Sequence, residues 1–348
     1  MLRPGAMGCS LAFAALLMAC GTERVELGPE GQVVTESGSD EVLHDLAPAP
    51  GSNNAVPAAS EASEVVVPAV NGERPPVSGA ANLESPPARL PLATGCKKVD
   101  FLFVVDNSAS MRGEQAKLLV SFPEFISVVQ QTLQIGDFHI MVLGTDGRAL
   151  QPGDPLPDAQ ACEEVLGAGR RRSLDGEECG LTDGAAFMTD TQLNLRETFS
   201  CAAQVGTDGD ADSEPMAAML AAIGPELNGK GACNAGFFRD DAVLVVTFIS
   251  DEEDDDSTGE PEDWHRLLLD AKRGNEDALV VLGLIGDNNK DNGLCSSVAA
   301  DAAPRLQEFV ARFGRRGLEG SVCAPSYGQF FAKAVGWVDG ACRDFVTR

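Results

Sequence analysis

The segment 99–111 constrains the fold of this chain more than any other part of the sequence. Five consecutive apolar residues, 101–105, end abruptly at the polar run Asp106-Asn107-Ser108-Ala109-Ser110. Short apolar runs bounded by residues that favour turns are typical of strands buried on both faces. The segment therefore predicts a buried strand followed at once by a turn that carries one carboxylate and two hydroxyl groups.

Strand-like and helix-like segments alternate along residues 96–348. Buried strands are predicted at 99–105, 138–143, 242–250 and 279–285. Apolar residues at helical spacing predict helices at 114–133, 191–204, 213–223, 263–272, 302–313 and 329–338. This alternation predicts an α/β fold with a doubly wound, mostly parallel sheet flanked by helices. Residues 147–190 exceed the usual length of a connection, and we expect a cysteine-containing insertion there.

The turn after the first predicted strand is a candidate metal site. Asp106, Ser108 and Ser110 alternate along the chain, and in a tight turn this spacing can direct three hard oxygen atoms at one point. Such oxygens favour Mg²⁺, Mn²⁺ or Ca²⁺ over softer metals. Ligands in open α/β sheets bind at the carboxyl ends of strands, which is where this turn lies. The alternative is an ordinary strand-to-helix turn in which Asp106 or Ser108 caps the helix.

The pattern resembles the metal-ion-dependent adhesion site of von Willebrand factor A domains. That family begins its site with Asp-x-Ser-x-Ser and adds a threonine from a later loop and an aspartate after a later buried strand. Thr207 follows Gly206 in a loop before a predicted helix, and Asp251 follows the run 242–250. The segments FVVDNSASM and FISDEEDD, with residues 234–241, also resemble segments that recur in surface lipoproteins of bacteria such as the myxobacteria.

The resemblance implies coordination chemistry rather than catalysis. Ser108 and Ser110 would bind a divalent cation, Mg²⁺ first among the candidates, through their hydroxyl groups. Thr207 would bind directly or through water, and Asp106 and Asp251 would supply charge. One coordination position would stay open for a carboxylate of a protein or polysaccharide partner. No positioned base or nucleophile accompanies these groups, so we expect no enzymatic activity.

A run of six acidic residues, 251–256, begins at the predicted ligand Asp251. Because like charges repel, such runs normally lie in solvated loops. Part of this run, Asp254 and Asp255, is a candidate for an auxiliary cation site.

The first 95 residues are predicted to form a leader and a tether. Residues 1–19 have one arginine and then an apolar stretch too short to span a membrane, which is typical of a signal peptide. They end at Leu17-Met18-Ala19-Cys20, which resembles a bacterial lipobox, so Cys20 is the expected lipidation site. Residues 20–95 lack aromatic side chains after Cys20 and hold half of the 20 prolines, a composition that favours a disordered acidic tether. We expect an exported protein anchored by lipid in the cell envelope, at the outer membrane.

Charge excludes some partners and cysteine usage indicates the compartment. A formal charge of −27 disfavours nucleic acid and anionic lipid surfaces, so the membrane contact expected is the lipid anchor alone.

Eight cysteines remain in 96–348, an even number that predicts disulfides in an exported protein. They permit 105 pairings, and the connectivity stays open. Our working pairs are Cys96–Cys342, Cys295–Cys323 and Cys162–Cys179.

The sequence thus predicts an envelope-anchored interaction module that binds a divalent cation and, through it, an acidic group. One alternative is a structural protein of an envelope assembly with a vestigial metal site. Another is a serine hydrolase that uses Ser108 or Ser110, although the chain lacks a Gly-x-Ser-x-Gly motif and neither His139 nor His265 lies in an evident catalytic loop. A phosphoaspartyl enzyme that uses Asp106 is also disfavoured, because Ser108 stands where the second aspartate is expected.

Overall fold

The computed structural model describes residues 97–132, 135–158, 160–209 and 213–345. The predicted signal peptide, Cys20 and the predicted tether lie outside the described residues. Cys96, the predicted partner of Cys342, lies outside them as well.

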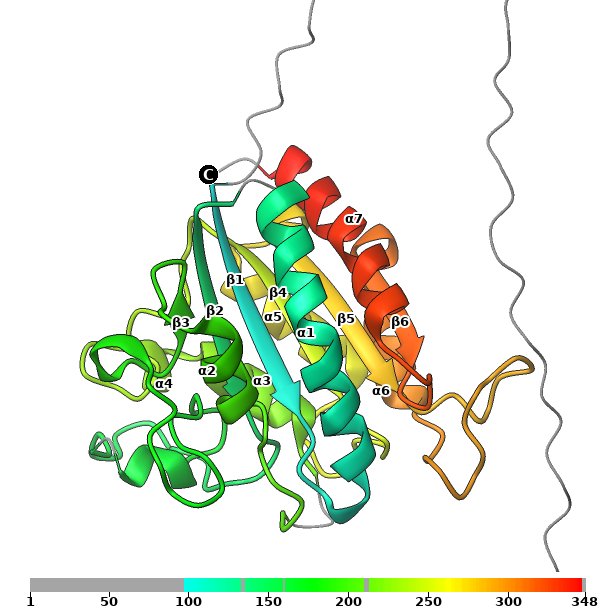
Figure 1. The fold of residues 1–348 in the computed structure, drawn as a ribbon, viewed down its shortest axis with the longest axis horizontal. Coiled ribbons are helices and arrows are strands. Elements are labelled where there is room, and N and C mark those ends of the chain that lie inside the picture. The colour runs from blue at the N-terminus through cyan, green and yellow to red at the C-terminus, as the bar shows by residue number, and fades with distance from the viewer. Residues whose placement is uncertain (1–96, 133–134, 159, 210–212, 346–348) are drawn as a thin grey trace, which may run out of the picture. The chain divides into compact units, whose positions relative to one another are not determined.

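A six-stranded sheet forms the centre of the fold, in the order β3-β2-β1-β4-β5-β6 (Figure 1). Five strands run parallel, and the short edge strand β3 pairs antiparallel with β2. The strands are β1 (Lys98–Val105), β2 (Asp137–Leu143), β3 (Met188–Thr189), β4 (Val243–Ile249), β5 (Leu279–Ile285) and β6 (Gly317–Ser321). The predicted α/β fold with a mostly parallel sheet is confirmed.

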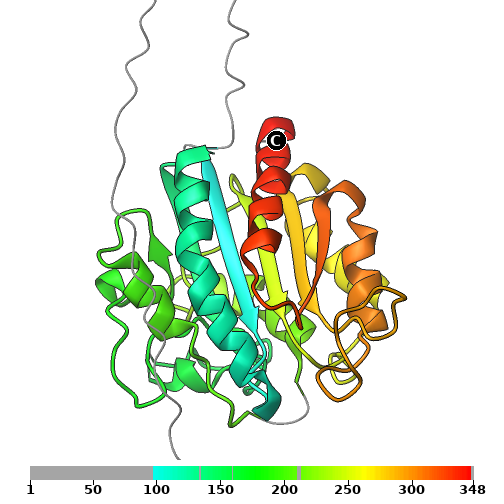
Figure 2. The same cartoon turned by 45° about the vertical axis from the view of Figure 1, so that its right-hand side comes forward.

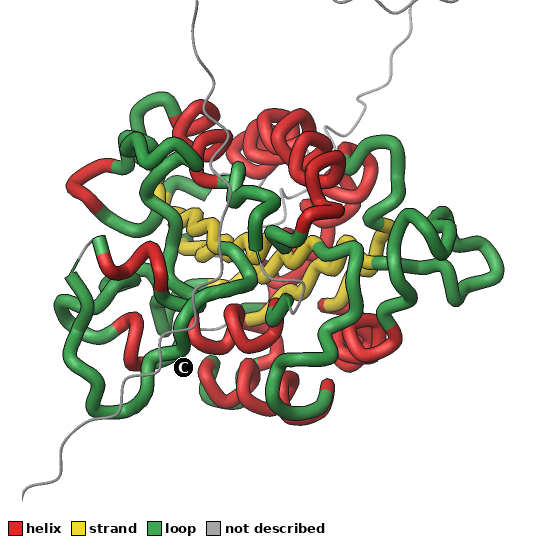
Figure 3. The backbone as a smooth tube through the Cα atoms, turned by 90° about the horizontal axis from the view of Figure 1, so that it is seen from below, coloured by secondary structure: helices red, strands yellow, loops and turns green. Residues whose placement is uncertain are grey.

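Helices cover both faces of the sheet, so the described chain has three layers (Figures 2 and 3). One face packs against α1 (Arg112–Thr132), α2 (Leu195–Ala202) and α7 (Gly328–Asp344). The other face packs against α3 (Pro215–Ile223), α5 (Pro261–Ala271) and α6 (Pro304–Arg312). A one-turn helix, α4 (Pro225–Asn228), follows α3. No described helix is both long enough and apolar enough to span a membrane.

The central strands are mostly apolar because both of their faces are buried. In β1, Phe101 and Phe103 point into the core under α1, whereas Leu102 and Val104 point into the core on the α3 side. Successive side chains of a strand alternate between the two faces, so a strand covered on both sides favours apolar residues on both faces. All seven residues of β4 and of β5 are buried for the same reason.

The structure adds elements that the hydrophobic pattern does not reveal. The edge strand β6 has the sequence GLEGS and is half-buried along its whole length. The strand β3 has only two residues. The helix α1 continues through Pro123.

Three disulfides are described, and one of our pairings is wrong. Cys295 pairs with Cys323 as expected. Cys162 and Cys179 do not pair with each other; they pair with Cys233 and Cys201, respectively. Both bonds join the irregular segment 147–190 to later parts of the chain, which nearness in sequence could not indicate. Cys342 is disulfide-bonded, and its expected partner Cys96 is outside the described residues.

The order of the strands creates a site at the carboxyl edge of the sheet. From β1 the chain crosses to β2 on one side, and from β4 it crosses to β5 on the other side. The turns after β1 and β4 therefore diverge at a switch point, where open α/β sheets bind ligands. Asp106 follows β1 and Asp251 lies two residues after the end of β4, so both are at this switch point. Figure 3 views this edge, with loops lying over the ends of the strands.

Candidate functional site

Two serines and one aspartate of the predicted set lie in direct contact at this edge. The hydroxyl oxygens of Ser108 and Ser110 are 3.2 Å apart. The Ser110 hydroxyl donates to Oδ1 of Asp251 at 3.0 Å. Ser108 and Asp251 are buried, and Ser110 is exposed. A short 3₁₀ turn, η1 (Ala109–Met111), brings Ser110 back over the end of β1 before α1 begins. The three oxygens therefore form one cluster that is open on the Ser110 side.

Asp106 shapes the turn that presents the two serines. It is fully buried, its Oδ1 accepts the backbone N–H of Ser108 at 2.8 Å, and its Oδ2 accepts the hydroxyl of Ser250 at 2.6 Å. The bond to Ser250 links the end of β1 to the end of β4, and so to Asp251. Ser250 was not among the predicted residues. Its position beside Asp251 at the end of a buried strand is the signal that could have indicated it.

Asp251 is a buried carboxyl whose charge is poorly neutralised. Burial, with the negative charges of Asp106 and Glu114, raises its pKa to about 6, against the lowering effect of the Ser110 hydrogen bond. Like charges nearby disfavour ionisation, whereas a cation favours it. The surroundings of Asp251 are therefore those of an anion that lacks a counterion.

Thr207 lies in a loop that is fixed to the same turn. Gln115 of α1 donates its amide N–H to the carbonyls of Asp106 and Gly206, at 3.1 and 2.6 Å. Gly209 donates its N–H to the carbonyl of Asn107 at 3.0 Å. A Cβ atom on Gly209 would lie 2.5 Å from the Asn107 side chain, so this close approach requires glycine. Within the described residues no hydrogen bond joins the Thr207 side chain to Ser108, Ser110 or Asp251.

Asn107, inside the serine motif, connects three loops. Its side-chain oxygen accepts from the N–H and the hydroxyl of Thr145, at 3.3 and 2.9 Å. Thr145 in turn accepts the hydroxyl of Ser213, at 2.6 Å, and lies directly after β2. The sequence did not indicate four residues that hold the loops around the cluster by hydrogen bonds, because none of them belongs to a motif of its own. They are Asn107, Gln115, Thr145 and Ser213.

Part of the acidic run after β4 is built into the fold, whereas Asp255 and Asp256 are exposed, as expected of a solvated loop. Asp254 is fully buried, and its carboxylate accepts the N–H groups of Met216 at the start of α3 and of Ser257, each at 2.9 Å. The half-buried Glu253 accepts the N–H groups of Arg305 and Leu306 at the start of α6, at 2.7 and 3.3 Å. Carboxylates are favourable there because helix N-termini carry unpaired N–H groups and positive potential. Burial raises the pKa of both groups.

The two residues predicted as an auxiliary cation site are separated by their partners. Both oxygens of Asp254 already accept backbone N–H groups. Asp255 is exposed, and its carboxylate is 4.0 Å from the guanidinium of Arg305. The auxiliary site therefore stays a prediction. The observed contacts give Asp254 another role, which is to cap α3.

The oxygen cluster fits a small divalent cation by its spacing. Octahedral Mg²⁺ binds oxygen at about 2.0–2.1 Å, which places neighbouring ligands about 2.9 Å apart. The Ser108–Ser110 and Ser110–Asp251 separations are 3.2 and 3.0 Å. Among the residues that the structure describes, no group of three or more His, Cys, Asp or Glu side chains could hold a metal ion. A cation at this edge would therefore depend on hydroxyl groups as well as on Asp251.

A second group of buried charges lies at the opposite, amino edge of the sheet. Asp100 near the start of β1 is fully buried, and its carboxylate accepts the N–H and the guanidinium of Arg239, at 2.9 and 2.8 Å. The ammonium of Lys272, also buried, donates to the carbonyls of Arg239 and Ala242 at 2.7 and 3.0 Å. Burial raises the pKa of Asp100 to about 6 despite both cations, and lowers the pKa of Lys272 to about 8.

The histidines considered for a hydrolase have other partners. The Nδ1 atom of His139 lies 2.9 Å from the carbonyl of Phe237, near the start of β2. His265 lies in α5, where its ring packs against Phe313. Neither contact involves Ser108 or Ser110, whose hydroxyls bond to each other and to Asp251.

Comparison with known proteins leaves the family of this chain open. No family model matches it, and no curated protein matches it. One of the solved structures that match is proximal thread matrix protein 1 from the mussel byssus, with 10% sequence identity and a TM-score of 0.38. The match covers 71% of this chain and 49% of that one. The chain thus spans about half the length of that structure, and so distant a likeness carries no argument about family or function.

Proposed function

We propose that this chain is an interaction module of the von Willebrand A type. It binds one divalent cation, Mg²⁺ in the first place, at the carboxyl edge of its sheet and captures an acidic group of a partner through that cation. Ser108, Ser110 and Thr207 supply hydroxyl ligands, and Asp106 and Asp251 supply charge. The protein is exported and anchored in the cell envelope by lipid at Cys20.

The contact between Ser110 and Asp251 is the observation that carries the proposal. It joins the turns after β1 and β4, residues 141 positions apart in sequence, at the spacing of neighbouring ligands of a small cation. The buried carboxylate there is surrounded by negative charge, which a bound cation would neutralise. Ser110 is exposed, which leaves one side of the cluster accessible to a partner.

Titration of the full chain with Mg²⁺, Mn²⁺ and Ca²⁺ by calorimetry tests the cation site directly. We expect binding of one ion per chain, lost in Ser110→Ala and in Asp251→Asn. Matched controls are Ser326→Ala, which removes another exposed hydroxyl, and Asp256→Asn, which removes an exposed charge from the same loop. Both controls should bind the ion as the unaltered chain does.

Capture from envelope extracts then tests the role of the cation in recognition. A partner retained in the presence of Mg²⁺ should be released by EDTA, and Asp251→Asn should retain none of it. Capture that persists in EDTA and in Asp251→Asn would replace this proposal with the alternative, a structural envelope protein whose metal site is vestigial.

A further inference from the structure

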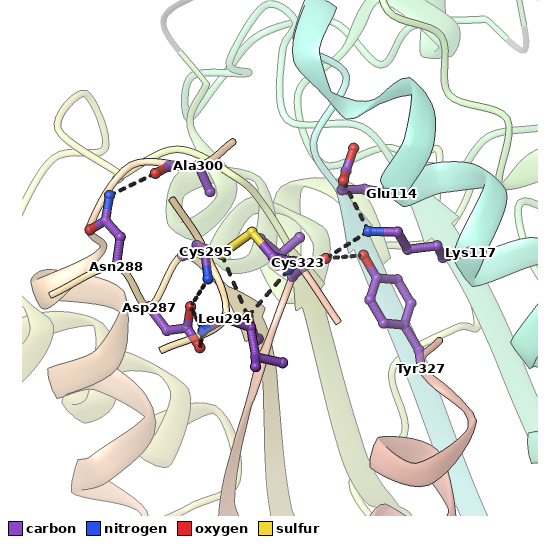
Figure 4. Close-up of a disulfide and its surroundings, with 12 residues drawn as sticks. Glu114, Lys117, Asp287, Asn288, Leu294, Cys295, Ala300, Cys323 and Tyr327 are labelled. Carbon is purple, nitrogen blue, oxygen red and sulfur yellow. Dashed lines mark hydrogen bonds and ion pairs between the residues drawn. A yellow bond between two sulfur atoms is a disulfide. The ribbon is translucent and has the colours of Figure 1, made fainter. Parts of the chain in front are cut away.

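The loop between β5 and α6, residues 286–303, is held rigidly beside the proposed cation site. Asp287 accepts the N–H groups of Leu294 and Cys295 with its carboxylate, at 3.0 and 2.8 Å, and Asn288 donates to the carbonyl of Ala300 at 2.8 Å (Figure 4). The Cys295–Cys323 disulfide attaches the loop to the chain after β6. These contacts fix the loop from within and from the neighbouring turn.

The far end of this loop is fixed to the site itself. Asp301 donates its N–H to the carbonyl of Asp251 at 2.8 Å. A Cβ atom on Gly286 would lie 1.7 Å from the carbonyl of Asp301, so this approach requires glycine at position 286. The segment Ser297–Asp301, with Ser110 and Asp251, lines a hollow of about 160 Å³.

The fixed loop presents an apolar side chain to solvent. Val298 is 96% exposed and lines the hollow that also contains Ser110 and Asp251. A second hollow of about 370 Å³ is lined by Arg112, Thr207 and Leu174, among others. Leu174 is 59% exposed. Each of the two hollows therefore combines predicted site residues with one strongly exposed aliphatic side chain.

We infer that Val298 and Leu174 are specificity-determining contacts for a protein partner. The inference rests on the proposed function: the partner presents an acidic side chain to the cation, and aliphatic neighbours of that side chain pack against Val298 and Leu174. Holding an apolar group at near-complete exposure on a fixed loop lowers the entropic cost of burying it in a complex. Ligand sites combine apolar lining residues with a few polar groups that fix the orientation of the ligand, and Val298 and Leu174 would supply the apolar part here.

Two features favour a protein segment over an acidic polysaccharide. No aromatic side chain that could stack on a sugar ring lines either hollow among the described residues. The chain has a formal charge of −27, and acidic side chains line both hollows: Glu252 and Asp301 the first, and Asp208, together with Arg112, the second. A polymer with a carboxylate on every unit would be repelled outside the cation, whereas a peptide with one acid among apolar residues would not.

Phage-displayed short peptides with one fixed glutamate and random neighbours test this inference. The library is selected on the full chain in Mg²⁺ and eluted with EDTA. We expect enrichment of aliphatic residues beside the glutamate. Val298→Ser and Leu174→Ser should each weaken binding of an enriched peptide about ten-fold, the effect of losing one buried aliphatic side chain. Val120→Ser on α1, which alters another valine that is 79% exposed, should change nothing.

The outcomes separate this inference from the function on which it rests. Glutamate peptides that bind in Mg²⁺ without preference for aliphatic neighbours, or equally to Val298→Ser, overturn the inference and leave the cation-dependent function standing. So does binding of polygalacturonate that is equal in the unaltered chain and in Val298→Ser. A chain that binds Mg²⁺ but no peptide also overturns the inference. Failure to bind Mg²⁺ in calorimetry removes both proposals.

Discussion

The two edges of the sheet place buried carboxylates in opposite electrostatic surroundings. At the amino edge, Asp100 is accompanied by the guanidinium of Arg239 and the ammonium of Lys272. At the carboxyl edge, Asp251 has the hydroxyl of Ser110 as its partner, and the charges acting on it from Asp106 and Glu114 are negative. Each arrangement buries an acid near the end of a strand, yet only the first supplies cations from the chain.

On the proposed function, this contrast separates a charge that stabilises the fold from a charge that would bind a cation. A buried ion pair is complete in itself, and breaking it leaves an uncompensated charge. A buried carboxylate near other acids has no such partner, so its charge lowers the stability of the folded chain. A bound cation would neutralise that charge and stabilise the folded chain. The same residue type therefore has opposite expected responses to mutation at the two edges.

Removing Asp100 should have the largest effect on stability. In Asp100→Ala the half-buried Arg239 and the buried Lys272 lose a fully buried counterion, although Arg239 keeps its pair with Asp137, and such losses typically cost about 3–5 kcal/mol. Urea unfolding measures the change. Asp241→Ala breaks an exposed pair with Lys98 and should cost no more than about 1 kcal/mol. Equal effects of the two variants would mean that the Asp100 pair is not a buried one in solution.

Adding Mg²⁺ should stabilise the folded chain through the proposed site at the carboxyl edge of the sheet. At a concentration one hundred times the dissociation constant, a ligand of the folded state adds about 2.7 kcal/mol to the free energy of unfolding. The gain should be absent in a Ser108→Ala, Ser110→Ala double variant and unchanged in Asp241→Ala. Urea unfolding with Mg²⁺ and with EDTA measures it, and an equal gain in the double variant would contradict the proposed ligands.

Asp251→Asn should stabilise the chain in EDTA, opposite in sign to the effect of Asp100→Ala. The amide removes a buried charge from the neighbourhood of Asp106 and Glu114 and can still accept from Ser110. We expect a gain of about 1–2 kcal/mol at neutral pH, from the raised pKa of Asp251 reduced for solvent close to the site. A loss of stability in EDTA would show that Asp251 is already compensated within the chain.

The affinity for Mg²⁺ should fall as the pH is lowered. Asp251 has a pKa of about 6 instead of its ordinary value of 3.8, so below pH 6 a proton competes with the cation for its carboxylate. Affinity should be about ten-fold weaker at pH 5 than at neutral pH. Calorimetry across this range measures the change. An affinity independent of pH between 5 and 7 would exclude Asp251 as the titrating group.

Much of the central sheet could be predicted because both of its faces are buried. The runs that became β1, β2, β4 and β5 have no polar interruption at most positions, and this pattern is readable without a structure. The strand β6 could not be predicted, since its sequence GLEGS is short, contains two glycines and gains its strand geometry from pairing with β5. The disulfides of Cys162 and Cys179 depend on where distant loops meet, which the sequence does not state.

The contact among Ser108, Ser110 and Asp251 could be predicted from the motif, whereas the residues that support it could not. Ser108, Ser110 and Asp251 follow buried strands, and the parallel sheet brings them into contact. Gln115 and Ser250 support the same cluster, but a glutamine on a helix and a serine at a strand end have many ordinary roles. The prediction for the acidic run was wrong at Asp254, because net charge conceals which side chains turn inward to the N-termini of helices.

The caps made by Glu253 and Asp254 have a consequence for the kinetics of the site. They fasten the segment that carries Asp251 to α3 on one side and to α6 on the other, without any contribution from an ion. This segment then does not have to fold before a cation can bind. The exchange rate of a cation there should be governed by how fast its hydration water leaves, so that Ca²⁺ and Mn²⁺ equilibrate sooner than the tightly hydrated Mg²⁺.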